Sequence, residues 1–194
     1  MRDLVSAGYQ QVMRLLAAVR EMDRRLTKRV ASWREPALHR TLSAVEEAAE
    51  GSKLWCGAAV VMVWIGGRDG RKAAVAGLTA LALAQLVSNG VCKQVSGRSR
   101  PPKEWIPHDE VEDRPDSSSF PSGHTAAAVA FTAAVAPSWP AAGTVCAVPA
   151  ALVAVERVQS GAHYPSDVAA GAALGLVSAW LVRRLPQQAL RRLP

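Results

Sequence analysis

The chain has 194 residues, enough for one domain with a sizeable core, and its formal net charge is +7. Hydrophobic residues make up 49% of it but aromatic residues only 5%, so Ala, Val and Leu supply most of the hydrophobicity. The basic residues do not gather in a patch with interleaved aromatic side chains, which argues against a nucleic-acid partner and fits a surface facing anionic lipid. Cys56, Cys92 and Cys146 lie far apart in apolar runs without a CxxC pair, so neither a disulfide framework nor a zinc site is indicated.

The N-terminal segment has the pattern of an amphipathic helix. Its apolar residues recur near helical spacing, which predicts a helix lying along a membrane interface, and we assign residues 1–50 to this interfacial segment. Charged residues interrupt the stretch throughout, so we expect no cleavable signal peptide. The apolar positions are Leu4, Val5, Val12, Leu15, Leu16, Val19 and Met22.

Long uncharged runs in the rest of the chain indicate membrane-spanning helices. Residues 73–92 carry no charge over 20 residues, close to the ~20 needed to cross a bilayer as a helix. Residues 117–155 contain only His124 and Cys146 as ionisable groups, and they are long enough for two spans around the turn APSWPAAG. A soluble helical bundle is the competing interpretation, because alanine is only weakly apolar.

Two further uncharged runs, 54–67 and 168–182, are shorter, at 14 and 15 residues. Flanking basic side chains could reach the interface from these runs, so we count them as spans as well. The fold class predicted is therefore all-α, a polytopic transmembrane helical bundle of about five spans over residues 51–186, with a basic C-terminal tail at 187–194.

Two polar interruptions separate the later spans, one at residues 93–124 and the other at 156–167. An even number of spans lies between them, so both emerge on the same side of the membrane. This topology allows the two loops to form one site.

The two loops contain the side chains that phosphoryl transfer needs. Three cations can neutralise a phosphate dianion, and a helix starting at Ser122 and Gly123 offers backbone N–H groups to the same anion. Two histidines can share nucleophile and proton work, and a carboxylate can orient one of them. Each feature alone has a structural explanation as a membrane-edge charge, a helix cap or a surface pair. The remaining members of the set are Lys93, Arg100, Arg157, His124, His163 and Asp167.

In these residues the sequence resembles the type 2 phosphatidic acid phosphatase superfamily, which includes lipid phosphate phosphatases, bacterial acid phosphatases and vanadium haloperoxidases. The first family motif, Lys, six residues, Arg-Pro, is matched by KQVSGRSRP at 93–101. The second is matched by PSGH at 121–124. The third, Ser-Arg, five residues, His, three residues, Asp, is matched in register by ERVQSGAHYPSD at 156–167, except at Glu156, where the family usually has serine.

The resemblance implies a role for each matched residue. His163 would attack phosphorus to give a phosphohistidine, with Asp167 bonded to its other ring nitrogen. His124 would protonate the leaving group and then deprotonate water. The phosphate would be bound by Lys93, Arg100, Ser122, Gly123 and Arg157. With the protein's own cations in this place, we expect no metal and no other cofactor.

Two alternatives to a lipid phosphatase stay open, and Glu156 motivates the first. A carboxylate beside the anion would be repulsive unless it points away or pairs with a cation, so a non-catalytic membrane protein with a degenerate site is one alternative. The other is a vanadate-dependent haloperoxidase, since those relatives have a nearly identical anion pocket.

The expected substrate is a lipid phosphate within the bilayer. Candidates are phosphatidic acid, phosphatidylglycerol phosphate, a polyprenyl phosphate or diphosphate, and a polyprenyl-linked sugar phosphate. The Ala- and Arg-rich composition suggests a bacterial plasma membrane, with the chain crossing it several times. The side that the site faces stays open, since a sixth span in the N-terminal segment would move the N-terminus to the other side. The spacing of Gly171 and Gly175 fits either a homodimer face or close packing inside the bundle.

Overall fold

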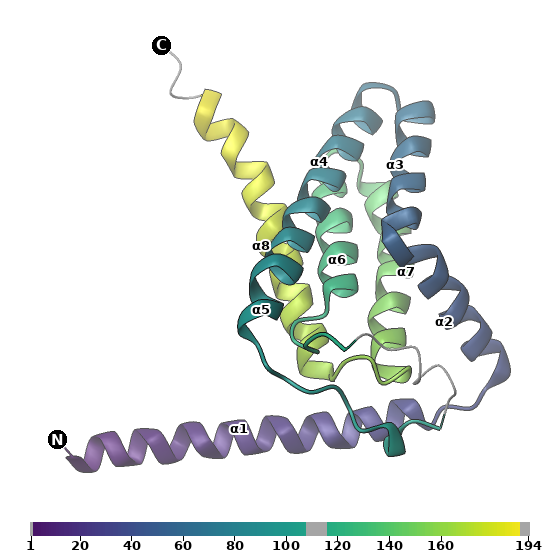
Figure 1. The fold of residues 1–194 in the computed structure, drawn as a ribbon. Helices are drawn as coiled ribbons and strands as arrows, with labels where there is room; N and C mark the ends of the chain where they lie inside the picture. The colour runs from purple at the N-terminus through teal and green to yellow at the C-terminus, as the bar shows by residue number, and fades with distance from the viewer. Residues whose placement is uncertain (1, 108–115, 191–194) are drawn as a thin grey trace.

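The computed structural model describes residues 2–107 and 116–190, with residues 2–7 and 185–190 described by their backbone alone. Within these ranges the chain is helical and contains no strand. The longer helices form a bundle, and the first helix lies across one end of it (Figure 1). The elements are α1 Arg2–Ala31, α2 Pro36–Ala49, η1 Glu50–Ser52, α3 Lys53–Ile65, α4 Gly67–Val87, a π-helical turn η2 Ser88–Cys92, α5 Lys93–Val95, η3 Lys103–Trp105, α6 Gly123–Val135, α7 Pro140–Gln159 and α8 Pro165–Leu190.

The helices confirm the predicted polytopic helical membrane bundle. In the described residues, four helical stretches are long and apolar enough to cross a bilayer, and a further helix, Gly123–Val135, is apolar but shorter. The four are Pro36–Ile65, Gly67–Val95, Pro140–Gln159 and Pro165–Arg184. The chain is therefore a polytopic helical membrane protein.

The first span is longer than its uncharged run suggested. Helices α2 and α3 follow one another through the short turn η1, where Gly51 takes a φ of 57° that favours glycine. Glu46 and Glu47 interrupt the apolar pattern of α2. The uncharged run that predicted the first span therefore did not include α2. At the other end, α8 runs on to Leu190, and residues 191–194 of the expected tail lie outside the described residues.

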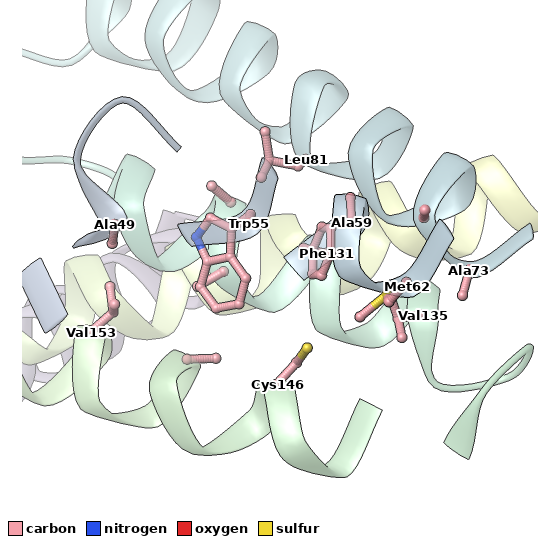
Figure 2. Packing of buried hydrophobic residues seen from close by; sticks show 14 residues of the cluster. Ala49, Trp55, Ala59, Met62, Ala73, Leu81, Phe131, Val135, Cys146 and Val153 are labelled. Carbon is pink, nitrogen blue, oxygen red and sulfur yellow. The ribbon is translucent and has the colours of Figure 1, made fainter. Parts of the chain in front are cut away.

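Helix α6 lies at the centre of the bundle, in contact with α4, α7 and α8. Most of its residues are small and buried, so its neighbours can approach closely on several sides. Its 13 residues are too few to cross the ~30 Å hydrocarbon layer at 1.5 Å per residue, but the surrounding helices shield it from lipid. Figure 2 shows Phe131 of α6 beside Trp55 of α3, with the ring centroids 5.4 Å apart.

The two glycines of α8 pack against α6, which decides between the two interpretations of their spacing. A Cβ at Gly171 would lie 2.4 Å from the carbonyl oxygen of Ser122, and one at Gly175 would lie 2.6 Å from that of Ala126. Both glycines are buried. Their spacing therefore serves close packing inside the bundle.

Helix α1 contacts the bundle along one narrow stripe. Asp23, Thr27 and Ala31 are buried at intervals of four residues, and the helix contacts α7, α8 and η3. The helix itself was predicted, and its location at the membrane interface stays a prediction. Apolar side chains between residues 9 and 26 are exposed, as expected of an interfacial helix. They are Tyr9, Val12, Met13, Leu15, Leu16, Val19, Met22 and Leu26.

The close packing of α8 on α6 can be tested with two glycine-to-alanine substitutions. Gly175→Ala places a methyl group against backbone atoms of α6 and should destabilise the protein by about 1–3 kcal/mol. Gly57→Ala is the matched control, because Gly57 is also in a helix and its Cβ would meet no atom within 4 Å. We expect a lower thermal unfolding midpoint in detergent for Gly175→Ala alone. Equal midpoints for the two variants would contradict the close contact.

Candidate active site

The two polar interruptions meet at one end of the bundle, as their topology predicted. The C-termini of α4 and α7 and the N-termini of α6 and α8 come together there (Figure 1). Backbone hydrogen bonds join the three motif segments: the N–H of Ser122 donates to Asp167 O at 3.1 Å, and the N–H of Ser119 donates to Arg98 O at 3.0 Å. The three stretches matched by sequence are thus one structural unit.

Ser122 and Gly123 begin α6 as predicted. The Oγ of Ser122 caps the helix by accepting the N–H of Thr125 at 3.4 Å, and the two hydroxyl oxygens lie 2.9 Å apart. A Cβ at Gly123 would lie 3.0 Å from the Oδ1 of Asn89, so glycine allows η2 to approach the helix start. The first N–H groups of a helix have no acceptor within it, and here they face the polar end of the bundle.

His163 lies in the loop between α7 and α8, with 3% of its surface exposed. Its Nδ1 is 2.6 Å from the carbonyl oxygen of Ser119. A carbonyl can only accept, so Nδ1 carries the proton and the neutral ring keeps a lone pair on Nε2. Burial, reinforced by the nearby Arg100 guanidinium, lowers the pKa of His163 well below its usual 6.5. The ring is therefore neutral at physiological pH, with Nε2 available as a nucleophile.

Asp167 lies close to His163 without the direct hydrogen bond that the motif implied. Its Oδ2 is 3.9 Å from Nδ1 of His163 and accepts the N–H of Tyr164 at 2.9 Å. Its Oδ1 accepts from Arg98 at 2.5 Å. The partner of the histidine is instead the Ser119 carbonyl, which no side-chain pattern could have indicated.

The predicted cations gather around the two histidines. His124 and His163 each lie within electrostatic range of Lys93, Arg100 and Arg157. Arg100 is held in place by backbone carbonyls, since its Nη1 donates to Ala162 O at 2.7 Å and its Nε to Ser117 O at 3.2 Å. The predicted site residues are thus brought to one place.

Glu156 pairs with its neighbour rather than facing the cluster as a lone charge. Its carboxylate is buried and accepts from the Nε of Arg157. The Nη2 of Arg157 lies 2.7 Å from the Oε1 of Glu46, which comes from α2. Two carboxylates therefore hold Arg157, and the repulsion that Glu156 could have caused is offset within the pair.

The sequence analysis missed Glu46, Arg98 and Asp23. Arg98 lies inside the first motif, between the two cations that were assigned. Asp23 is a carboxylate within the apolar stripe of an amphipathic helix, a position where a charge calls for a partner. The sequence contained a signal for Arg98 and Asp23, because each is a charged residue in an unexpected position. The contact of Glu46 had no such signal, since it depends on how α2 packs against α7.

An apolar groove begins beside this site. It runs between α7 and α8 with α6 along its floor, and its volume is about 790 Å³. Thr125, which bonds Ser122, and Val168, which follows Asp167, line its near end. Residues farther along it include Val129, Ala147, Ala151 and Leu176.

Comparison with known proteins matches the same region. A sequence profile of the PAP2 superfamily matches residues 73–191, which include all three motifs. A segment of 60 residues is 48% identical to the lipid A 1-phosphatases of Rhizobium etli and Rhizobium johnstonii, covering 29% of this chain. The match spans only 25% and 23% of those two curated relatives.

Two solved structures share the fold. The transmembrane PAP2-type phosphatidylglycerolphosphate phosphatase of Bacillus subtilis superposes with a TM-score of 0.66 at 23% identity, covering 88% of this chain and 87% of that one. Aquifex aeolicus LpxE superposes with a TM-score of 0.61 at 20% identity, covering 82% of this chain and 93% of that one.

The fold and the site define a helical membrane protein with cations and histidines gathered at one end of its bundle. The profile match extends over more than half of the chain. The chain belongs to the PAP2 superfamily, and the resemblance of its motifs is confirmed.

The pairing of Arg157 with Glu46 predicts an effect on anion affinity. A phosphate bound by Arg157 would compete with the Glu46 carboxylate for the same guanidinium, so Glu46→Gln should strengthen the binding of vanadate, a phosphate analogue, roughly two- to fivefold. Glu47→Gln is the matched control, because Glu47 is exposed on the same helix. The measurement is the dissociation constant of vanadate for the purified variants. Weaker binding in Glu46→Gln would show that Glu46 supports the anion site instead of competing with it.

Proposed function

We propose that this protein is an integral-membrane lipid phosphatase that hydrolyses a phosphomonoester or diphosphate of an amphiphilic substrate through a phosphohistidine intermediate. The observation that carries the proposal is the tautomer of His163, whose Nδ1–H is fixed by a carbonyl while Nε2 keeps its lone pair among three cations. Membership of the PAP2 superfamily and the phosphatase names of the similar proteins support it. A bacterial plasma membrane is the proposed location.

In the first step, Nε2 of His163 attacks phosphorus and the P–N bond forms as the bond to the leaving oxygen breaks. The negative charge of the bound phosphate favours the protonated form of His124, which gives its proton to that oxygen. In the second step, His124 takes a proton from water, the water oxygen attacks phosphorus and the P–N bond breaks, which releases phosphate. Asp167, 3.9 Å from Nδ1, stabilises the positive charge that develops on the His163 ring.

The phosphoryl oxygens are held by the protein's own charges and dipoles. Lys93, Arg100 and Arg157 neutralise the charge, and the helix start at Ser122 and Gly123 donates backbone N–H groups. Arg157 binds phosphate in exchange for part of its pairing with Glu46 and Glu156. These cationic side chains would stabilise the phosphoryl charge in the way that a metal ion does in many phosphatases.

The test is phosphate release by purified protein from a panel of lipid phosphates. The panel contains phosphatidic acid, phosphatidylglycerol phosphate, polyprenyl mono- and diphosphates, a polyprenyl-linked sugar phosphate and lipid A. We expect turnover of at least one of them that chelators leave unchanged. His163→Ala should abolish turnover, while His124→Ala should keep its affinity for vanadate.

A second measurement identifies the intermediate. With p-nitrophenyl phosphate, whose leaving group needs no proton, His124→Ala should accumulate an acid-labile phosphoenzyme that His163→Ala never forms. Full activity of His163→Ala would overturn the assignment. Silence across the panel would favour a non-catalytic protein, and vanadate-dependent bromination would identify a haloperoxidase instead.

The apolar groove provides a place for the hydrocarbon chain of the substrate, since it begins beside Ser122 and Asp167 and runs between α7 and α8. Ala151→Phe puts a bulky ring into the groove at a position away from the polar site. The Michaelis constant should rise for a long-chain lipid phosphate and stay unchanged for a short-chain analogue with the same head group. Equal changes for both substrates would contradict a role for the groove.

A further inference from the structure

Arg98 lies between two buried carboxylates that come from opposite ends of the sequence. Its Nη1 donates to Oδ1 of Asp167 at 2.5 Å, and its Nη2 donates to Oδ2 of Asp23 at 2.7 Å. The side chains of Asp167 and Asp23 are 0% and 1% exposed, and that of Arg98 is 28% exposed. The guanidinium also lies over the ring of Tyr164, 4.4 Å from its centroid.

Asp167 depends on this cation for its charge. A carboxylate removed from water is costly unless a counter-charge and hydrogen bonds compensate it, and Arg98 supplies both. Together with the Tyr164 N–H, Arg98 also fixes the direction of the carboxylate beside His163. A planar fork with two donating nitrogens can join two carboxylates at once, which a lysine cannot do in the same geometry.

Asp23 holds the other side of the fork and also caps α8. Its Oδ1 accepts the N–H of Ser166 at 2.9 Å, and its Oδ2 accepts the hydroxyl of Ser166 at 2.6 Å. Ser166 is in the first turn of α8, where backbone N–H groups have no acceptor within the helix. One carboxylate of α1 therefore contacts both the cation behind Asp167 and the helix that carries Asp167.

We propose that Arg98 is a positioning residue of the phosphatase site and that Asp23 sets its position, so that the interfacial helix α1 is a working part of that site. The proposal rests on the phosphatase function proposed above. Neither residue reaches the phosphate; Arg98 acts through Asp167, and Asp23 acts through Arg98 and Ser166.

The placement of Asp23 couples the site to the lipid surface. Asp23 lies on the same stripe of α1 as Val12, Leu16 and Val19, which are exposed beyond the bundle. A helix that lies in the interface with these side chains in lipid presents Asp23 to the bundle in one fixed rotation. Rotation of α1 away from this position would withdraw the carboxylate from Arg98 and Ser166.

The experiment compares kcat, KM and vanadate affinity for the full-length protein and its variants in lipid–detergent micelles. Arg98→Gln should lower kcat roughly 10- to 100-fold, and Asp23→Asn roughly three- to tenfold, because a supporting partner of a site residue is lost. KM and the vanadate dissociation constant should stay within about twofold of wild type, because the phosphate-binding groups remain. Arg98→Lys should give a kcat between those of Arg98→Gln and wild type.

The matched control is Glu21→Gln. Glu21 lies on α1 two residues before Asp23, but it pairs with Arg24 and Arg25 of the same helix on its exposed side. This substitution also removes one carboxylate from α1, and it should leave kcat unchanged. A loss equal to that of Asp23→Asn would assign the effect to the charge of α1 and overturn the proposal.

The double variant Asp23→Asn with Arg98→Gln tests whether the two residues act in series. If Asp23 acts mainly through Arg98, the double variant should have nearly the kcat of Arg98→Gln alone. Multiplied effects, an unchanged kcat in Arg98→Gln, or a loss of vanadate affinity that parallels the loss of kcat would each overturn the positioning role. These outcomes are distinct from failure of the proposed function, which the wild-type protein and His163→Ala decide on the lipid panel.

Discussion

The hydrogen bond from the N–H of Ser122 to the carbonyl of Asp167 joins the start of α6 to the first turn of α8, and the arrangement of the site depends on it. This contact requires the backbones of the two helices to approach closely, which Gly171 permits because a Cβ there would meet the Ser122 carbonyl at 2.4 Å. The start of α6 and the loop that carries His163 are thereby fixed relative to each other. The geometry of the candidate site and the packing of the helices are thus set by the same few atoms.

The charges of the site are arranged so that most have a defined partner before any substrate arrives. Arg100 donates to backbone carbonyls, Arg157 pairs with Glu156 and Glu46, and Arg98 joins Asp23 to Asp167. In the phosphoryl transfer proposed above, such pairing would limit the reorganisation that the developing charge requires. It also explains how glutamate can stand at position 156: the extra negative charge is held by the adjacent arginine, and α2 adds a second carboxylate to the same guanidinium.

Much of the architecture could be predicted from sequence, because membrane-spanning helices and phosphate-binding motifs both have characteristic residue patterns. Uncharged runs located the spans, and three ordered motifs located the residues that the structure brings together. Helix α2 was missed as part of the first span because Glu46 and Glu47 break its apolar pattern. The carbonyl of Ser119 could not be predicted as the partner of His163, since every residue carries a carbonyl and only the fold selects one. The bridge from Asp23 to Ser166 joins residues 143 positions apart, beyond any local periodicity.

The position of the groove and the position of α1 together suit a substrate with one charged end and one apolar end. The charged end of the proposed substrate would meet the cations where four helices of the bundle terminate, and the groove leads away from that point between α7 and α8. Helix α1 crosses the same end of the bundle (Figure 1), and its apolar side chains between residues 9 and 26 are exposed. If α1 lies in the interface as predicted, at the level of lipid head groups, its contact with the motif loops would place the site at that level too. A phosphate attached to a lipid would then reach His163 while its chain stays within the hydrocarbon layer, because the groove extends from the site along the spans.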